Sequence, residues 1–303
     1  MSNLKQIIHY LKNPVLQPQH ISNNKLWNIF KFWGFFAICA TISSLPGYLL
    51  LPLTGFTSSN NAVLQEQLLL PVWFSIVSGV IIAPIREEAT FRLWIKPNLP
   101  NISIALGFLV AMIVEVYIRL SELTINNVSL LTIHGILIPA IASSLFYLVL
   151  KNNKSILDKI ASYISKNFNI VFWASHIIFA LIHCINYDIA KVWYIIPILV
   201  LPQFIIGLYL GFLRVNYNFK WGLAAHSLHN FLALATFTLI GSKATELSGK
   251  LQANNWNFMR AYAELSIQDL LSFILGCSIY ISAILSFGAT IVESMSTNRK
   301  LMN

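Results

Sequence analysis

Hydrophobic residues form long uninterrupted runs along this 303-residue chain, and polar residues gather in short stretches between them. Several runs reach the roughly 17–25 apolar residues that a helix needs to cross a bilayer. A spanning barrel would instead show short segments of alternating apolar and polar residues. The pattern therefore predicts an all-α, polytopic membrane helix bundle with about eight transmembrane helices, at residues 30–53, 68–85 (continuing towards 95), 102–118, 128–150, 169–187, 192–213, 219–240 and 270–292.

The first 25 residues are largely polar, and we expect them to form a cytosolic N-terminal leader. Residues 26–303 would then make up a single transmembrane domain, since no internal repeat or second soluble domain is visible. Within the leader, apolar residues recur at helical spacing, which indicates a short amphipathic helix at the membrane interface. These residues are Leu4, Ile7, Ile8 and Leu11.

The composition supports a membrane protein and argues against soluble classes. Hydrophobic residues make up 56% of the chain and charged residues only 10%, whereas a soluble domain carries about 25% charged residues. The chain thus lacks the polar surface that water would require. The net charge of +9 does not predict a nucleic-acid partner, because in membrane proteins a basic balance usually reflects charged cytosolic loops. The expected partner is the lipid bilayer.

The distribution of lysine and arginine predicts the orientation. With the N-terminus in the cytosol, fifteen of the twenty basic residues fall in cytosolic segments, as the excess of positive charge on that side requires. The other five are Arg119, Lys191, Lys243, Lys250 and Arg260. We therefore expect a multi-pass protein of the cytoplasmic membrane with both termini in the cytosol.

A charged cluster ends the second apolar run, in the stretch Arg86-Glu87-Glu88-Ala89-Thr90-Phe91-Arg92. Glu88 and Arg92 are four residues apart, so on a helix they can form an ion pair that lowers the cost of burying each. Glu87 projects about 100° away from Glu88 and would remain free to act on a water molecule. The simpler alternative is a charged cytosolic loop that flanks the helix.

Polar residues in two later runs favour a functional site over a loop. His183 lies in the fifth predicted helix, and His226 and Asn230 lie one turn apart in the seventh. Polar groups inside a membrane face the bundle interior or a wet cavity. A single buried histidine is commonly a structural hydrogen-bonding group. The combination of a glutamate pair, a histidine and a His/Asn pair from three helices points instead to catalysis.

In this order, the three motifs resemble those of the CAAX-protease and bacteriocin-processing (CPBP, or Abi) intramembrane peptidases. They are EExxxR (Glu87, Glu88, Arg92), FxxxH (Phe179, His183) and HxxxN (His226, Asn230). The resemblance covers roughly residues 68–234. Between the first and second motifs lie two apolar helices more than this family usually has, and an even number leaves the direction of the fifth helix unchanged.

The resemblance implies a role for each motif residue. Glu87 would be the main catalytic carboxylate and Glu88 its supporting partner, while Arg92 holds the pair in place. His183 and His226 would bind or activate the water, and Asn230 would steady the oxyanion. The stretch Phe172 to His176 also reads FxxxH, so His176 is the alternative to His183. We further expect Glu115 and His134, in the two additional helices, to pair with each other or to fill the inserted region.

Two questions remain open at the level of sequence. Glu87, His183 and His226 could bind a divalent metal such as zinc, although the chain lacks an HExxH helix; we favour water activated by glutamate without a resident metal. The expected function is hydrolysis of a peptide bond in a membrane-associated peptide or protein, with or without a lipid modification. The alternative is a non-catalytic transporter or a peptide-binding immunity protein, because buried Glu and His also serve proton relays.

Overall fold

The computed structural model describes residues 3–17, 25–54, 72–120, 133–236 and 267–302, and every regular element in these ranges is helical. The longer helices are α1 (Asn3–Lys12), α2 (Lys25–Leu50), α5 (Ala83–Arg92), α6 (Leu99–Leu120), α8 (Ile138–Asn152), α9 (Lys154–Lys166), α10 (Phe168–Ile182), α13 (Leu201–Asn216), α14 (Phe219–Thr236) and α17 (Ile267–Met302). The shorter elements are η1 (Leu51–Thr54), α4 (Val72–Ile76), η3 (Val77–Ile82), η4 (Leu93–Ile95), η5 (Ile133–Leu137), η6 (His183–Asn186), α11 (Ile189–Val192), η7 (Trp193–Ile195) and α12 (Ile196–Leu199).

Four of the described helical segments are long and apolar enough to cross a membrane: Lys25–Gly47, Leu99–Ile118, Gly135–Asn152 and Phe168–Asn186. A fifth span arises if Ile189–Leu199 and Leu201–Asn216, which meet at a bend of 46°, count as one. Helices α5 and α14, which carry the polar residues singled out above, are not among them. The prediction of an all-α membrane bundle is confirmed for the described part of the chain.

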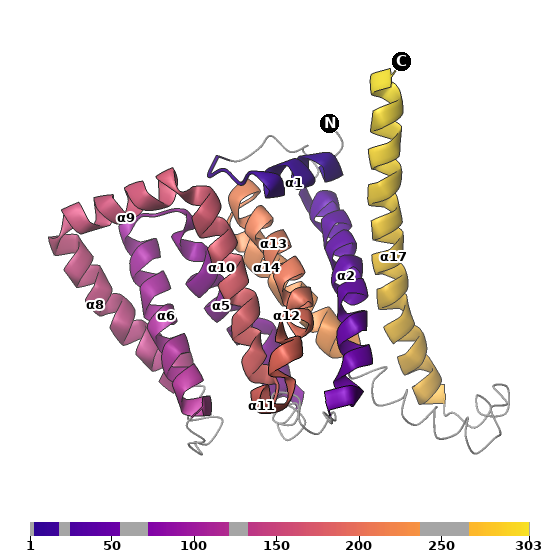
Figure 1. Ribbon diagram of the computed structural model, residues 1–303, viewed down its shortest axis with the longest axis horizontal. Coiled ribbons are helices and arrows are strands. Elements are labelled where there is room, and N and C mark those ends of the chain that lie inside the picture. The colour runs from indigo at the N-terminus through magenta and orange to yellow at the C-terminus, as the bar shows by residue number, and fades with distance from the viewer. Residues whose placement is uncertain (1–2, 18–24, 55–71, 121–132, 237–266, 303) are drawn as a thin grey trace.

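The long helices lie side by side, with α13 near the middle of the bundle (Figure 1). Helix α13 contacts α2, α10 and α14, and α5 packs against α6, α10 and α14. Helix α17 covers the outer side of α2. On the opposite side, α6 and α8 pair as a hairpin, in which α6 contacts α5 and η4 and α8 contacts α9. These two helices are the additional pair noted in the sequence.

Two glycines allow α13 to approach α10 closely. A Cβ atom added at Gly207 would lie 2.9 Å from Cδ1 of Phe179, and one added at Gly211 would collide with the ring of His176. The middle of α13, from Ile206 to Val215, is buried throughout. Small residues at such positions let helix backbones pack tightly in a membrane. The glycine pair thus brings the FxxxH stretch of α10 against the centre of the bundle.

The amphipathic helix predicted in the first 25 residues is present as α1. Its apolar side packs on protein, because Leu4, Ile7 and Tyr10 are all buried. The ring of Tyr10 meets those of Phe172 and Phe212 edge-on, with centroids 5.8 and 5.4 Å apart. Helix α1 therefore belongs to the bundle, and the division into a leader and a domain at residue 25 stays a prediction.

Candidate active site

Helix α5 presents its two adjacent glutamates in different environments. The Glu88 side chain is fully buried, whereas that of Glu87 is 20% exposed. This is the separation expected from about 100° of rotation between neighbouring residues on a helix. Helix α5 continues directly from the π-helix η3, and Pro84, which has no backbone N–H to donate, stands at the junction between them. One carboxylate is thus enclosed by protein and the other is accessible.

The enclosed carboxylate forms the ion pair that the spacing predicts. Nη1 of Arg92 donates to Oε1 of Glu88 at 2.5 Å, and both side chains are fully buried. Nη2 of Arg92 lies 3.4 Å from the Gly207 carbonyl oxygen on α13. The guanidinium also stacks 4.4 Å from the ring centre of Phe179 on α10, a contact that favours a cation. Arg92 thereby ties α5 to α10 and α13.

His226 of α14 lies between the two glutamates. Its Nδ1 is 2.8 Å from Oε1 of Glu88, and its Nε2 is 3.5 Å from Oε2 of Glu87. If Nδ1–H donates to Glu88, Nε2 presents a lone pair or a second proton towards Glu87. His226 itself is buried. The imidazole therefore joins the enclosed carboxylate to the accessible one, a link that the sequence motifs alone did not reveal.

Asn230 lies one turn beyond His226, and its side chain meets the π-helix η3. Nδ2 of Asn230 donates to the carbonyl oxygen of Gly79 at 2.9 Å. Short π-helical stretches shift backbone hydrogen bonds and often occur at functional sites. The contact holds the Asn230 amide against the segment that leads into α5. The same amide group has a second N–H that can donate to another acceptor.

His183 borders the site through an aromatic ring and does not contact the glutamates directly. Its Nδ1 is 2.7 Å from the Phe179 carbonyl oxygen, and its ring centre is 4.9 Å from that of Phe179. The Phe179 ring in turn meets the His226 ring at 6.3 Å. Among the described residues, no hydrogen bond joins His183 to Glu87, Glu88 or His226. The structure thus groups Glu87, Glu88, Arg92 and His226, with Asn230 and His183 beside them.

His176, the alternative in the same helix, packs into the protein core. Its Nδ1 is 2.6 Å from the Phe172 carbonyl oxygen, and the ring is buried against the backbone of Gly211. Phe179 separates it along α10 from the half-buried His183. The ring of α10 that meets His226 is that of Phe179, which also contacts His183. The assignment of His183 over His176 stays a prediction.

Two further ionic groups contact the helix α5 that carries the glutamates, although the sequence motifs predicted no role for them in the site. The buried Arg214 donates from Nε to the Arg92 carbonyl oxygen at 2.9 Å and from Nη2 to that of Leu93 at 3.2 Å. It therefore caps the C-terminal end of α5, where a cation is favourable. On the other side of α5, Arg86 forms an ion pair with Glu115 of α6. The side chain of His134 lies outside the described part of the structure.

The described residues do not assemble a metal site. Catalytic zinc needs three protein ligands around one point, with a fourth position for water. Glu87 and His226 are close enough to share an ion, but His183 is turned towards the Phe179 carbonyl. Within the described ranges, no group of three or more His, Cys, Asp or Glu side chains could hold a metal ion. The arrangement offers instead an accessible carboxylate next to an oriented imidazole, which suits acid–base chemistry on water.

Compared with models of known protein families, with curated proteins and with solved structures, the chain gives no match.

Proposed function

We propose that this protein is an intramembrane endopeptidase that uses a glutamate-activated water molecule. The observation that carries the proposal is the position of His226, between the enclosed Glu88 at 2.8 Å and the accessible Glu87 at 3.5 Å. A simple structural ion pair needs only Glu88 and Arg92. The second carboxylate and an imidazole aimed at it provide a base and a proton carrier at one place.

In the proposed reaction, the accessible Glu87 takes a proton from water, and the oxygen of that water attacks the carbonyl carbon of the scissile peptide bond. Negative charge then develops on the carbonyl oxygen, where an N–H donor lowers the energy of the transition state. The amide of Asn230, with one N–H held by Gly79, is the donor that we assign. As the carbon–nitrogen bond breaks, the proton passes from Glu87 to the departing amine.

Glu88 and Arg92 position these groups without contacting the substrate. Because Glu88 accepts hydrogen bonds from Arg92 and His226 at the same oxygen, its charge is compensated and it holds the imidazole in one orientation. Such a partner fixes the tautomer of a histidine. Nε2 is then directed at Glu87, where it can share the proton that Glu87 takes from water.

The proposed topology has eight crossings, as the sequence predicts, with the α1 and α9 end of the bundle in the cytosol. Helices α1 and α9 lie across the same end, and the last turns of α17 point that way too (Figure 1). His226 is seven residues into α14, which begins at Phe219 near this end. At about 1.5 Å per residue, the site would lie roughly 10 Å below the cytosolic interface. The substrate would be a membrane-associated peptide or protein segment, with or without a lipid modification.

The test is cleavage by the purified protein in lipid nanodiscs. The probes are internally quenched peptides with a hydrophobic segment, supplied with and without a prenylated cysteine. We expect cleavage by the wild type and a loss of at least about 100-fold in Glu87→Gln, the size typical of removing a general base. Asp188→Asn, which changes an acid that pairs with Lys191, is the matched control and should cleave as the wild type does. Equal cleavage by Glu87→Gln would end the proposal.

A transporter or peptide-binding protein is the rival, and the bend of 46° before α13 favours it to some extent. Broken helices line the binding sites of many transporters. In that case the wild type would cleave none of the probes, and proteoliposomes would take up a peptide or proton instead. Transport without any cleavage of the probes would show that the protein is a transporter and not a peptidase.

A further inference from the structure

Helix α9 lies across one end of the bundle, between the ends of α8 and α10 (Figure 1). Its inner side is apolar: Ile164 is buried, and Leu157 and Ile160 pack against the hydrophobic core. An amphipathic helix in this position is suited to the layer of lipid headgroups. The polar side of α9 is therefore placed where it can meet those headgroups.

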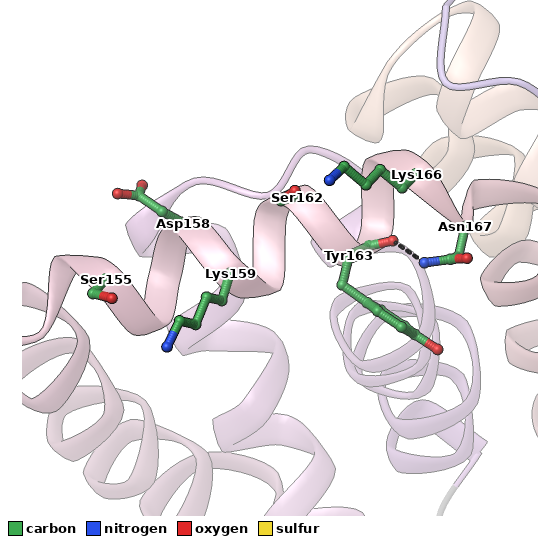
Figure 2. A pocket seen from close by; sticks show the side chains of 7 residues that line it. All are labelled: Ser155, Asp158, Lys159, Ser162, Tyr163, Lys166 and Asn167. Atoms are coloured by element: carbon green, nitrogen blue, oxygen red, sulfur yellow. Dashed lines mark hydrogen bonds between the residues drawn. The ribbon is translucent and has the colours of Figure 1, made fainter.

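The polar side of α9 carries an ordered row of donors. Ser155, Lys159, Ser162 and Lys166 follow one another at spacings of four, three and four residues, so they share one face of the helix. Together with Asp158, Tyr163 and the cap residue Asn167, they line an open hollow of about 590 Å³ (Figure 2). The Asn167 amide donates to the Tyr163 carbonyl oxygen at 3.1 Å, which fixes the end of the row.

The charged residues that line the hollow are Lys159, Lys166 and Asp158, so its lining has a net positive charge. From Lys151 to Lys166 the chain has four lysines and one acidic residue, Asp158. None of these lysines forms an ion pair with another described residue. A lysine row on an amphipathic helix next to a membrane span attracts anionic lipids, by about 1 kcal/mol per lysine near the surface. Lys159 and Lys166 stand about one turn to either side of Ser162 along the helix, so their flexible side chains can both swing towards a phosphate bound near that hydroxyl.

Exposed apolar side chains occur in α9 itself and at the adjoining ends of α8 and α10. Leu148 and Val149, at the end of α8 that leads into α9, are 56% and 52% exposed, and Ile170 at the start of α10 is 68% exposed. Ile156 of α9 is also exposed. These side chains are where acyl chains would lie if the headgroup occupied the hollow. A phospholipid would contact both the polar and the apolar side chains of this surface, whereas a free anion would contact only the polar ones.

We infer that the polar face of α9 is a binding site for an anionic phospholipid. Lys159 and Lys166 contact the phosphate, the serine hydroxyls donate to its oxygens, and the Asp158 carboxylate accepts from a hydroxyl of the headgroup. A glycerol headgroup has one negative charge and two such hydroxyls, so phosphatidylglycerol is the lipid that fits this set. The inference uses none of the residues assigned to catalysis, so it can be tested independently of the proposed peptidase activity.

The experiment measures binding of fluorescent phosphatidylglycerol to the full-length protein in neutral detergent micelles. Lys159→Gln/Lys166→Gln is the test variant. Lys12→Gln/Lys25→Gln removes the same charge from two exposed lysines outside α9 and is the matched control. Phosphatidylcholine with the same acyl chains and free glycerol phosphate are the competing probes. Tryptophan fluorescence during heating verifies that each variant is folded.

We expect phosphatidylglycerol to bind the test variant roughly ten- to thirtyfold more weakly than the wild type. The control variant should stay within about twofold, because its lysines lie outside the hollow. Neither phosphatidylcholine nor glycerol phosphate should compete. Unchanged binding in the test variant, an equal loss in the control variant, or effective competition by glycerol phosphate would each overturn the inference. Either of the first two results would show that Lys159 and Lys166 do not bind the lipid specifically. The third would show that the hollow binds a free anion and not a lipid.

Discussion

Nδ1 of His226 lies 2.8 Å from Oε1 of Glu88, the same oxygen to which Arg92 donates at 2.5 Å. Glu88 is thus shared by a guanidinium and an imidazole and is fully buried. Its neighbour Glu87 is partly exposed and lies 3.5 Å from the far nitrogen of that imidazole. In the proposed reaction, these two adjacent residues of one motif have separate tasks: Glu88 maintains the structure of the site, and Glu87 reacts with water.

The first prediction concerns the stability of variants of these two glutamates. Glu88→Gln removes the negative charge that compensates Arg92, and an unpaired buried charge costs about 3–5 kcal/mol. Glu87→Gln alters a partly exposed group and should change the free energy of unfolding by less than about 1 kcal/mol. Thermal unfolding in detergent, followed by tryptophan fluorescence, measures both. A Glu87→Gln variant less stable than Glu88→Gln would reverse the two roles.

Much of the bundle could be predicted from the sequence, because lipid requires long apolar helices with internal hydrogen bonds. The described parts of the predicted spans are helical, and α1 is the helix expected near the N-terminus. The burial of α1 could not be predicted, because its apolar stripe suits a membrane surface as well as a protein core. The contacts of Tyr10 with Phe172 and Phe212 show that the apolar side of α1 packs on the protein core.

Within the site, contacts between residues of the same helix could be predicted from the sequence, but contacts between different helices could not. The Glu88–Arg92 pair follows from a spacing of four residues on one helix. The contact of His226 with Glu88 joins residues 138 positions apart, and no local rule supplies it. Lysine and arginine counts also mislead in detail, because Lys31, Arg92 and Arg214 are buried in the bundle although the count treats them as cytosolic loop charges.

The second prediction concerns the contact between α10 and α13. Gly211→Ala places a methyl group against the His176 ring, and overpacking of this kind costs about 1–3 kcal/mol. His176→Ala removes the opposing ring, so the double variant Gly211→Ala/His176→Ala should be more stable than the sum of the two single effects implies. A double-mutant cycle from unfolding measurements gives this coupling. Strictly additive effects would contradict the contact.

The third prediction tests Arg214 as the cap of α5. Its guanidinium donates to the carbonyl oxygens of Arg92 and Leu93, and the same group lies 5.3 Å from the Phe219 ring. Arg214→Leu leaves these buried carbonyls without their donors, at a cost of about 1–3 kcal/mol for each. Arg214→Lys keeps the charge but not the planar fork, so it should lie between the wild type and Arg214→Leu.

Peptide cleavage distinguishes this cap from a general contribution to packing. Since Arg214 holds the end of α5 next to Arg92, its loss should lower kcat more than it changes KM for the quenched peptides. The conservative Arg214→Lys variant should recover part of kcat. Variants that lower stability to the same extent elsewhere, such as Gly211→Ala, provide the comparison. An equal fall of kcat in both at matched stability would show that Arg214 acts on packing alone.

The final prediction concerns the ion pair between Arg86 and Glu115, which joins α5 to the α6–α8 hairpin. Both side chains are 12% exposed, so removal of one partner leaves the other charge largely buried. Glu115→Gln should therefore destabilise the protein by about 1–3 kcal/mol, as expected when a buried charged group loses its partner. The double variant Arg86→Gln/Glu115→Gln should recover most of that loss, because neither charge is then left unpaired. Unfolding in detergent measures the cycle; a double variant as unstable as both single changes added together would show that the hairpin and α5 are energetically independent.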